Sequence, residues 1–229
     1  MAEGRGNEDR SRKRKPPDTA RVLEFYERTA SRYDRSIRFW ERVLRMEPGR
    51  RWLAGEAGGR VLEIGIGTGR NLPNYREDVH VTGIELSPSM LQIARARAAD
   101  CRAPVELMVG DAAALPFPDA SFDTVIFCLT LCTVPDDHRA VKEAVRALRR
   151  GGQMLLLEHV RSSNPVVRIG QRALEPISLR LEADHLTREP LELLRDAGLV
   201  IEHLERWALG IMERVRATKT GVMESGSSS

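Results

Sequence analysis

The sequence contains few cysteines, no long apolar run and no histidine pair at metal-ligand spacing. Its three cysteines are an odd number without paired spacing, which excludes a disulfide framework and a cysteine-rich zinc module. No apolar run approaches the roughly 20 residues of a membrane-spanning helix. The charged N-terminus is followed by no apolar stretch, so we expect no signal peptide and a cytoplasmic location. The five scattered histidines predict no metal site.

The sequence after residue 17 also lacks an excess of charge, although the whole chain has a formal net charge of +3. The first 17 residues hold six basic and three acidic residues, which equals the whole excess, so residues 18–229 sum to zero. A basic nucleic-acid-binding domain is therefore not expected. We interpret residues 1–17 as a disordered basic tail, with attraction to anionic lipid headgroups or to nucleic acid as alternatives. Residues 221–229 are interpreted as a flexible tail.

Residues 18–220 are expected to form a single soluble domain, because 41% apolar and 30% charged residues suffice to close one core at this length. Strand and helix patterns alternate from residue 60 to about residue 200, which predicts an α/β fold with a parallel sheet. The expected strands are 60–64, 80–85, 104–109, 122–129 and 153–159, followed by an antiparallel pair at 199–208 and 210–218. The expected helices are two before residue 60, the first capped by Asp18, then 87–99, 137–149 and 187–197.

The segment 164–186 is long for a connection between a strand and a helix. We interpret it, together with the two N-terminal helices, as a cap over the substrate. It mixes apolar residues with arginines, and we expect its apolar stripe to pack into the core, with a lipid groove as the alternative. The stripe consists of Ile169, Leu174, Ile177 and Leu179.

The strongest indication of a ligand-binding site is the run Glu63-Ile64-Gly65-Ile66-Gly67-Thr68-Gly69, at the end of the first expected strand. The dinucleotide fingerprint G-x-G-x-x-G would need its last glycine at position 70, where this chain has Arg70. The acid Glu63, two residues before the first glycine, is badly placed for a pyrophosphate. It suits a cofactor that carries an ammonium group and a sulfonium, and S-adenosylmethionine is that cofactor.

Two further acids stand at the ends of the next two expected strands. Glu85, 22 residues after Glu63, can accept hydrogen bonds from both ribose hydroxyls. Asp111 can accept from the adenine amino group, with Ala112 or Leu86 against the ring. In parallel sheets ligands bind beyond the carboxyl ends of the strands, so we expect these acids and the glycines to form one site.

With these motifs the sequence resembles the class I S-adenosylmethionine-dependent methyltransferases over about residues 21–217. The matching stretches are VLEIGIGTGRNLPNY (61–75), VTGIELSPSMLQIARARA (81–98), GDAAALPFPDASFDTVIF (110–127) and AVRALRRGGQMLLLEHV (144–160). The resemblance implies a Rossmann-like, doubly wound, seven-stranded sheet of order 3-2-1-4-5-7-6 with the last strand antiparallel, helices on both faces and an N-terminal helical lid. It implies cofactor contacts from Glu63, Gly65, Gly67, Gly69, Glu85, Leu86, Met90, Asp111, Ala112 and Cys128.

Within this family the chain looks like the branch of ubiquinone/menaquinone-biosynthesis, phosphatidylethanolamine N- and small-molecule thiol methyltransferases. The N-terminal YERTASRYD resembles the lid of the first two groups, and FCLTLCTV (127–134), LEHV (157–160), ALEP (173–176) and HLTRE (185–189) resemble the thiol enzymes. The basic tail departs from the apolar N-terminal anchor usual in those thiol enzymes, and Arg150 stands where many relatives have proline. The loop after the fourth strand lacks the Asn/Asp-Pro-Pro-Tyr/Phe pattern of nucleic-acid amino-methylating enzymes, which argues against nucleic acid as partner.

The resemblance implies transfer of a methyl group to a small-molecule or lipid acceptor: a thiol, an aminophospholipid or a quinone-like ring. At most peripheral membrane contact is expected. The residues proposed for catalysis are His159 at the end of the fifth strand, His185 and the lid residue Tyr33, as proton acceptors or closing groups. Because strand side chains alternate, Glu158 and His159 should face opposite ways. The alternatives are a non-catalytic protein that binds S-adenosylmethionine and, against the glycine spacing, an NAD-dependent oxidoreductase.

Overall fold

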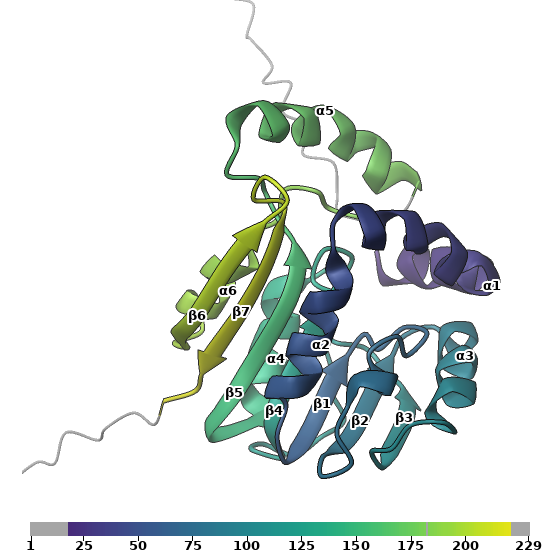
Figure 1. The fold of residues 1–229 in the computed structure, drawn as a ribbon, viewed down its shortest axis with the longest axis vertical. Helices are drawn as coiled ribbons and strands as arrows, with labels where there is room; N and C mark the ends of the chain where they lie inside the picture. The colour runs from purple at the N-terminus through teal and green to yellow at the C-terminus, as the bar shows by residue number, and fades with distance from the viewer. Residues whose placement is uncertain (1–17, 182, 221–229) are drawn as a thin grey trace, which may run out of the picture.

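The computed structural model describes residues 18–181 and 183–220, so both predicted tails, 1–17 and 221–229, lie outside the described residues. The described chain forms a seven-stranded sheet of order β3-β2-β1-β4-β5-β7-β6, in which β7 runs antiparallel to both neighbours (Figure 1). This confirms the predicted α/β architecture and strand order. The strands are β1 (Arg60–Ile64), β2 (His80–Glu85), β3 (Val105–Val109), β4 (Phe122–Cys128), β5 (Leu148–His159), β6 (Val200–Trp207) and β7 (Met212–Thr218).

Helices cover both faces of the sheet. They are α1 (Thr19–Val43), α2 (Met46–Glu56), α3 (Pro88–Ala98), α4 (Asp137–Ala147), α5 (Pro165–Leu181) and α6 (Pro190–Asp196), with a short 3-10 turn at Leu72–Asn74. The predicted caps are present: Asp18 accepts the backbone N–H of Arg21 at 2.9 Å, and Ser87 accepts that of Met90 at 3.1 Å. Among the described residues, no helix combines the length and the apolar character needed to cross a bilayer.

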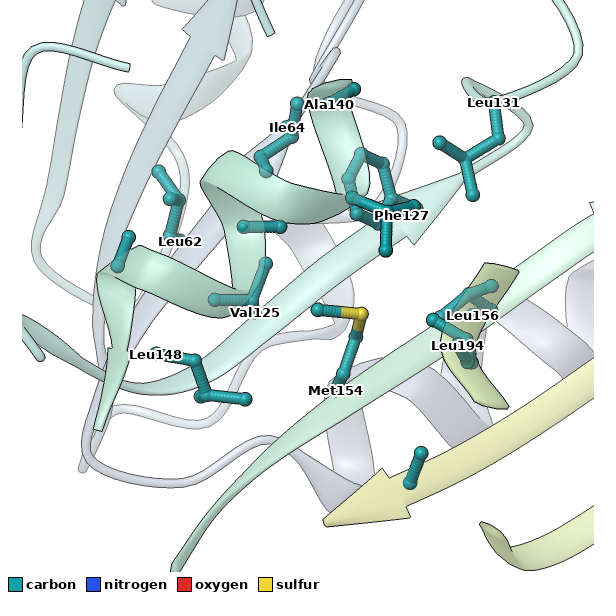
Figure 2. Packing of buried hydrophobic residues seen from close by; sticks show 14 of the residues in the cluster. Leu62, Ile64, Val125, Phe127, Leu131, Ala140, Leu148, Met154, Leu156 and Leu194 are labelled. Atoms are coloured by element: carbon teal, nitrogen blue, oxygen red, sulfur yellow. The ribbon is translucent and has the colours of Figure 1, made fainter. Parts of the chain in front are cut away.

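The core is divided by the sheet into two clusters, because successive side chains of a strand point to opposite faces. In β4, Val125 and Phe127 belong to the cluster under α4 and α6, while Ile126 and Cys128 belong to the cluster under α2. Figure 2 shows the first cluster, in which side chains from neighbouring strands pack with Ala140 of α4 and Leu194 of α6. Both faces of the central strands are therefore buried, as their apolar sequences predict.

Two predicted helix boundaries are wrong. The helix expected to run to residue 149 ends at Ala147, because Leu148 already pairs with Phe122 at the start of β5. The glycines after it therefore lie within the strand rather than terminating the helix. The last helix begins at Pro190 instead of residue 187, because proline fits the first position of a helix and has no N–H to satisfy.

The segment predicted only as a long connection contains the 17-residue helix α5. It begins where Asn164 Oδ1 accepts the backbone N–H of Val166 at 3.0 Å. The expectation that its apolar stripe packs into the core is wrong: Ile169 is 68% exposed and Ile177 is 55% exposed. The polar side chains Gln171 and Glu175 occupy the protein-facing side of α5 instead, through bonds to the segments before and after the helix. Figure 1 shows α5 at one end of the molecule, above α1.

Candidate functional site

The loops that follow β1, β2, β3 and β4 line, together with α1, an open cleft. Most of the predicted site residues line it: Tyr33, Glu63, Gly65, Gly67, Glu85, Leu86, Met90, Asp111, Ala112 and Cys128. Gly69, His159 and His185 are not among the lining residues. The cleft therefore brings together residues from four strand ends, as expected for ligand sites of parallel sheets.

The glycine loop after β1 uses its glycines in two different ways. A Cβ atom on Gly65 would collide with the side chain of Thr130, which itself donates a hydrogen bond to the carbonyl of Ile64 at 3.1 Å. Gly67 has a φ of 59°, and a Cβ atom there would meet nothing closer than 3.9 Å, the methyl carbon of Met90. Gly65 is thus required by packing, whereas Gly67 keeps its backbone open to the cleft. Gly69 packs towards Ala94 of α3.

Glu63 is a buried acid in the wall of the cleft. Its two carboxylate oxygens accept hydrogen bonds from Asn71 Nδ2 at 2.7 Å and from the Tyr75 hydroxyl at 2.8 Å. Burial raises the pKa of Glu63 to about 7, although these two bonds and the nearby Arg50 favour the charged form. A cation bound beside Glu63 would replace the lost solvation and favour the carboxylate, so this position suits an ammonium group.

Glu85 at the end of β2 and Asp111, two residues after β3, also line the cleft. Glu85 Oε2 accepts the backbone N–H of Gly67 and Oε1 that of Ser87, both at 2.9 Å. Burial raises the pKa of Glu85 against the effect of these bonds. Each oxygen keeps a further lone pair, so Glu85 can still accept hydroxyl hydrogens. Asp111 Oδ1 accepts the backbone N–H of Ala113 at 2.8 Å and leaves its second oxygen for a ligand.

Helix α1 is bound over the glycine loop by three acids whose contacts the sequence analysis did not predict, although Asp34 belongs to the lid motif YERTASRYD. Glu27, Asp34 and Glu41 are spaced by seven residues, about two helical turns, and therefore share one face of α1. Asp34 accepts hydrogen bonds from Thr68 Oγ1 at 2.7 Å and from Arg97 at 2.6 Å. The partners of the three acids are, in order, Ser87 and Ser89, Thr68 and Arg97, and Arg70 and Arg50. The spacing of seven residues is the sequence pattern that could have indicated that these acids share one face of α1.

The buried cation Arg50 was also missed. Its guanidinium lies 3.1 Å from Glu41, donates to Asn71 Oδ1 at 2.9 Å and lies 3.3 Å from the sulfur of Cys128. Burial nevertheless raises the pKa of the Cys128 thiol to about 11, so the thiol stays protonated. The same burial raises the pKa of Tyr33. Both groups therefore serve the cleft as neutral side chains, and Tyr33 is a hydroxyl rather than a phenolate.

His159 belongs to a cluster beside the cleft. Its Nε2 lies 3.1 Å from Asp184 Oδ1, and the Cys132 thiol is close to the same carboxylate. The ligand atoms of these three residues lie within 4.8 Å of one another, so the cluster could hold a metal ion. Because His159 already pairs with Asp184, this contact needs no metal, and the predicted absence of a metal stays a prediction. Burial, Tyr33 and this cluster raise the pKa of Tyr26, which lines the cleft and adjoins the cluster.

Glu158 and His185 take part in neighbouring contacts outside the cleft lining. Glu158 Oε1 accepts the backbone N–H groups of Thr130 and Leu131 at 2.9 and 3.0 Å, and burial raises its pKa to about 7. It thus holds the loop after β4 in place. The backbone N–H of His185 donates to the carbonyl of Cys132 at 2.9 Å, and burial lowers the pKa of the His185 ring.

Comparison with known proteins agrees with this geometry. Residues 62–156 match the family described as a methyltransferase domain. The chain is 43% identical over 115 residues to a phosphatidylethanolamine N-methyltransferase of Cereibacter sphaeroides. This match covers 49% of this chain and 57% of that protein. It is 33% identical over 160 residues to a ubiquinone/menaquinone biosynthesis C-methyltransferase of Hahella chejuensis, which covers 64% of this chain and 62% of that protein. The chain thus spans less than two thirds of the length of these relatives.

Among solved structures, one from Thermotoga maritima, described as an S-adenosylmethionine-dependent and possible histamine N-methyltransferase, superimposes with a TM-score of 0.65 at 27% identity. That match covers 86% of this chain and all of the other. A methyltransferase from Haloferax volcanii, solved with its Trm112 activator, superimposes with a TM-score of 0.70 over 87% of this chain and 98% of the other. Its identity is only 19%, so it supports the fold alone.

Proposed function

We propose that this chain, which carries a class I S-adenosylmethionine-dependent methyltransferase domain, transfers a methyl group from S-adenosylmethionine to a small-molecule acceptor. One observation carries the proposal. Glu63, Glu85 and Asp111, from the ends of three strands, line the same cleft as the open backbone of Gly67. This donor and acceptor set fits an ammonium group, a ribose and an adenine, and S-adenosylmethionine carries all three.

In this proposal each wall of the cleft has its own task. Glu63 receives the ammonium group, Glu85 accepts from the ribose hydroxyls, and Asp111 accepts from the adenine amino group. Leu86, Met90 and Ala112 give the adenine ring apolar contacts, and Cys128 faces the methionine portion as a neutral thiol. Gly69 contributes indirectly: it packs against Ala94 of α3 and does not face the cleft, so it holds the glycine loop in place. When bound, S-adenosylmethionine supplies an electrophilic methyl group on a sulfonium.

The acceptor is proposed to bind between α1 and the loop after β4, where Tyr26, Tyr33 and Thr133 line the cleft. Methyl transfer needs alignment and exclusion of water more than acid catalysis, and the closed lid serves both. Tyr33 orients the acceptor as a hydrogen-bonding hydroxyl. His159, oriented by Asp184, is proposed to receive the proton of an acceptor that must lose one, and Tyr26 adjoins both groups. His185 is proposed to position the loop through its bond to Cys132.

The acceptor class is proposed to be a thiol, an aminophospholipid or a quinone-like ring. Relatives named as a phosphatidylethanolamine N-methyltransferase and as a C-methyltransferase of ubiquinone/menaquinone biosynthesis support an amphipathic acceptor. A chain that binds S-adenosylmethionine without catalysis is the alternative. The fold does not distinguish the two, because function belongs to the site rather than to the architecture.

The test combines binding and transfer. Titration calorimetry with S-adenosylhomocysteine should give saturable binding at one site, and NADH should give none. S-adenosylmethionine with a labelled methyl group is then incubated with host-cell extract, which is separated into low-mass thioethers, lipids, quinones and nucleic acid. Label in one of the first three fractions supports the proposal and selects the acceptor. Label in nucleic acid contradicts it, and binding without transfer favours the non-catalytic alternative.

A further inference from the structure

Helix α5 presents its apolar side away from the protein. Val166 is 77% exposed and Ile169 is 68% exposed, and three further large side chains on this helix are more than half exposed. At 100° per residue, these positions fall within one face of the helix. The exposed apolar face consists of Val166, Ile169, Leu174, Ile177 and Leu181.

The polar side of α5 is bound to the protein. Gln171 donates to the carbonyls of Val160 at 2.9 Å and Leu186 at 3.0 Å, and its carbonyl accepts the backbone N–H of Ser162 at 2.8 Å. Glu175 accepts the hydroxyl hydrogen of Thr187, at 2.7 to 2.8 Å from its two oxygens. These contacts fix the rotation of α5 about its axis. The apolar face cannot turn inward without breaking all of them, so its exposure belongs to the folded state.

The charges around this face are of one sign. Arg180 falls within this face and Arg172 follows at its edge, and both are exposed. The acid of the helix, Glu175, is bound to Thr187 on the inner side, where Arg168 also lies. A face that combines apolar side chains with arginines suits a surface that offers both hydrocarbon and negative charge. A second copy of the chain fits worse, because a two-fold contact through this face would bring the arginines of both copies together.

The basic N-terminal segment joins the protein at the same place. Arg21, two residues after the start of α1, donates to the carbonyls of Arg180 at 2.7 Å and Leu179 at 3.2 Å, in the last turn of α5. Residues 1–17 carry a net charge of +3, which equals that of the whole chain. The chain therefore enters the described fold beside the exposed face, and its charge has the sign of the α5 arginines.

We propose that the apolar face of α5 and its arginines bind the surface of an anionic lipid bilayer, with the helix lying in the plane of the headgroups. Thr19 and Val22, which line the cleft, flank Arg21 at this junction. Docking would thus bring the rim of the cleft close to the bilayer. This consequence for an acceptor drawn from the membrane rests on the proposed function, whereas the binding itself does not.

The test is sedimentation of the full chain with vesicles of phosphatidylcholine alone or mixed with phosphatidylglycerol. We expect binding to the mixed vesicles that weakens with added salt. Ile169→Glu with Ile177→Glu should lower the partition coefficient about tenfold or more, because two apolar side chains are lost from the interface. Arg172→Gln with Arg180→Gln should lower it on mixed vesicles only, by about fivefold for each charge.

The matched control is Val200→Glu with Leu204→Glu, which places the same two charges on apolar side chains of β6 that are 49% and 42% exposed. It should leave vesicle binding unchanged. All variants keep the N-terminal segment, so binding through that segment alone would survive both substitutions in α5 and would overturn the proposal. Equal binding to neutral and anionic vesicles would also overturn it. So would a wild-type dimer that the isoleucine variant converts to monomers while vesicle binding is absent.

S-adenosylhomocysteine affinity and thermal unfolding are measured on the same variants. Both should equal the wild-type values, because the substituted side chains are exposed and lie outside the cleft lining. A chain that binds vesicles but not S-adenosylhomocysteine would contradict the proposed function alone. A chain that binds S-adenosylhomocysteine but not vesicles would contradict the membrane proposal alone.

Discussion

The Tyr75 hydroxyl donates a hydrogen bond of 2.8 Å to the buried carboxylate of Glu63, in the wall of the candidate cofactor cleft. Tyr75 follows the glycine loop by six residues, and Asn71 supplies the second bond at 2.7 Å. These donors hold in place an acid that burial would otherwise favour in its neutral form. The proposed recognition of an ammonium group at Glu63 would thus depend on Tyr75 and Asn71, which do not line the cleft.

Tyr75→Phe should weaken binding of S-adenosylhomocysteine by about 1 kcal/mol at neutral pH, because the Glu63 carboxylate loses one donor. The deficit should shrink at higher pH, where Glu63 ionises without help. Calorimetric titrations at several pH values measure both effects. A deficit that does not change with pH would mean that Tyr75 acts through packing instead.

The free energy of unfolding of the ligand-free protein should fall as pH rises from about 4.5 to 7. Burial raises the pKa values of Glu63 and Glu158 from 4.5 to about 7, so in this window the folded chain holds protons that the unfolded chain has released. Each group contributes a slope of roughly 1.4 kcal/mol per pH unit. Urea unfolding across this pH range measures the slope, and Glu63→Gln should reduce it. An unchanged slope in that variant would contradict the raised pKa of Glu63.

Gly67→Ala should leave the fold intact and weaken S-adenosylhomocysteine binding at least tenfold. The added methyl group meets no atom within 3.9 Å in the ligand-free cleft, and its positive φ costs about 1 kcal/mol of stability. Gly65→Ala is the matched comparison, and it should lower the melting temperature much more because its methyl group collides with Thr130. If Gly67→Ala kept the wild-type affinity, the backbone of the glycine loop would not contact the ligand. Gly67→Val should abolish binding.

Glu85→Ala should weaken S-adenosylhomocysteine binding by about 1.5–3 kcal/mol, the scale of hydrogen bonds to a charged group. It should also destabilise the loop, because the N–H groups of Gly67 and Ser87 lose their acceptor. Glu85→Gln keeps one acceptor oxygen, so it should lose less affinity for S-adenosylhomocysteine and less stability than Glu85→Ala. Calorimetry together with thermal unfolding separates the two effects. A change below a few tenths of a kcal/mol in affinity would place the ribose elsewhere.

Asp34→Asn should loosen α1 over the glycine loop, because the bond to Arg97 loses its charge and Thr68 its strongest acceptor. The pair is partly exposed, so we expect only about 1 kcal/mol, or about a fivefold faster release of S-adenosylhomocysteine. Stopped-flow displacement measures the rate. Glu24→Gln, in an exposed ion pair with Arg28 on the same helix, is the control and should change nothing. Equal rates for both variants would mean that α1 does not limit release.

The sequence predicted the parts of this protein that depend on neighbours in the chain. The strands at residues 60–64 and 80–85 have the predicted bounds, because their apolar runs end at glycines or at an acid. The cleft could be anticipated because adjacent parallel strands end at the same edge, where Glu63, Glu85 and Asp111 must meet. Helix α5 was missed as a helix because its outward side is apolar and Pro176 interrupts its pattern.

What only the tertiary structure decided is which groups are buried and what they touch. Arg50 lies beside Asn71 and Cys128 because α2 packs over the sheet, and no local pattern marks it. The raised pKa of Glu63 follows from burial among residues of separate segments. The outward apolar face of α5 follows from bonds made by Gln171 to the chain on either side. Solvation and pairing are set by atoms distant in sequence, so residue type and spacing determine the elements but not their exposure or charge.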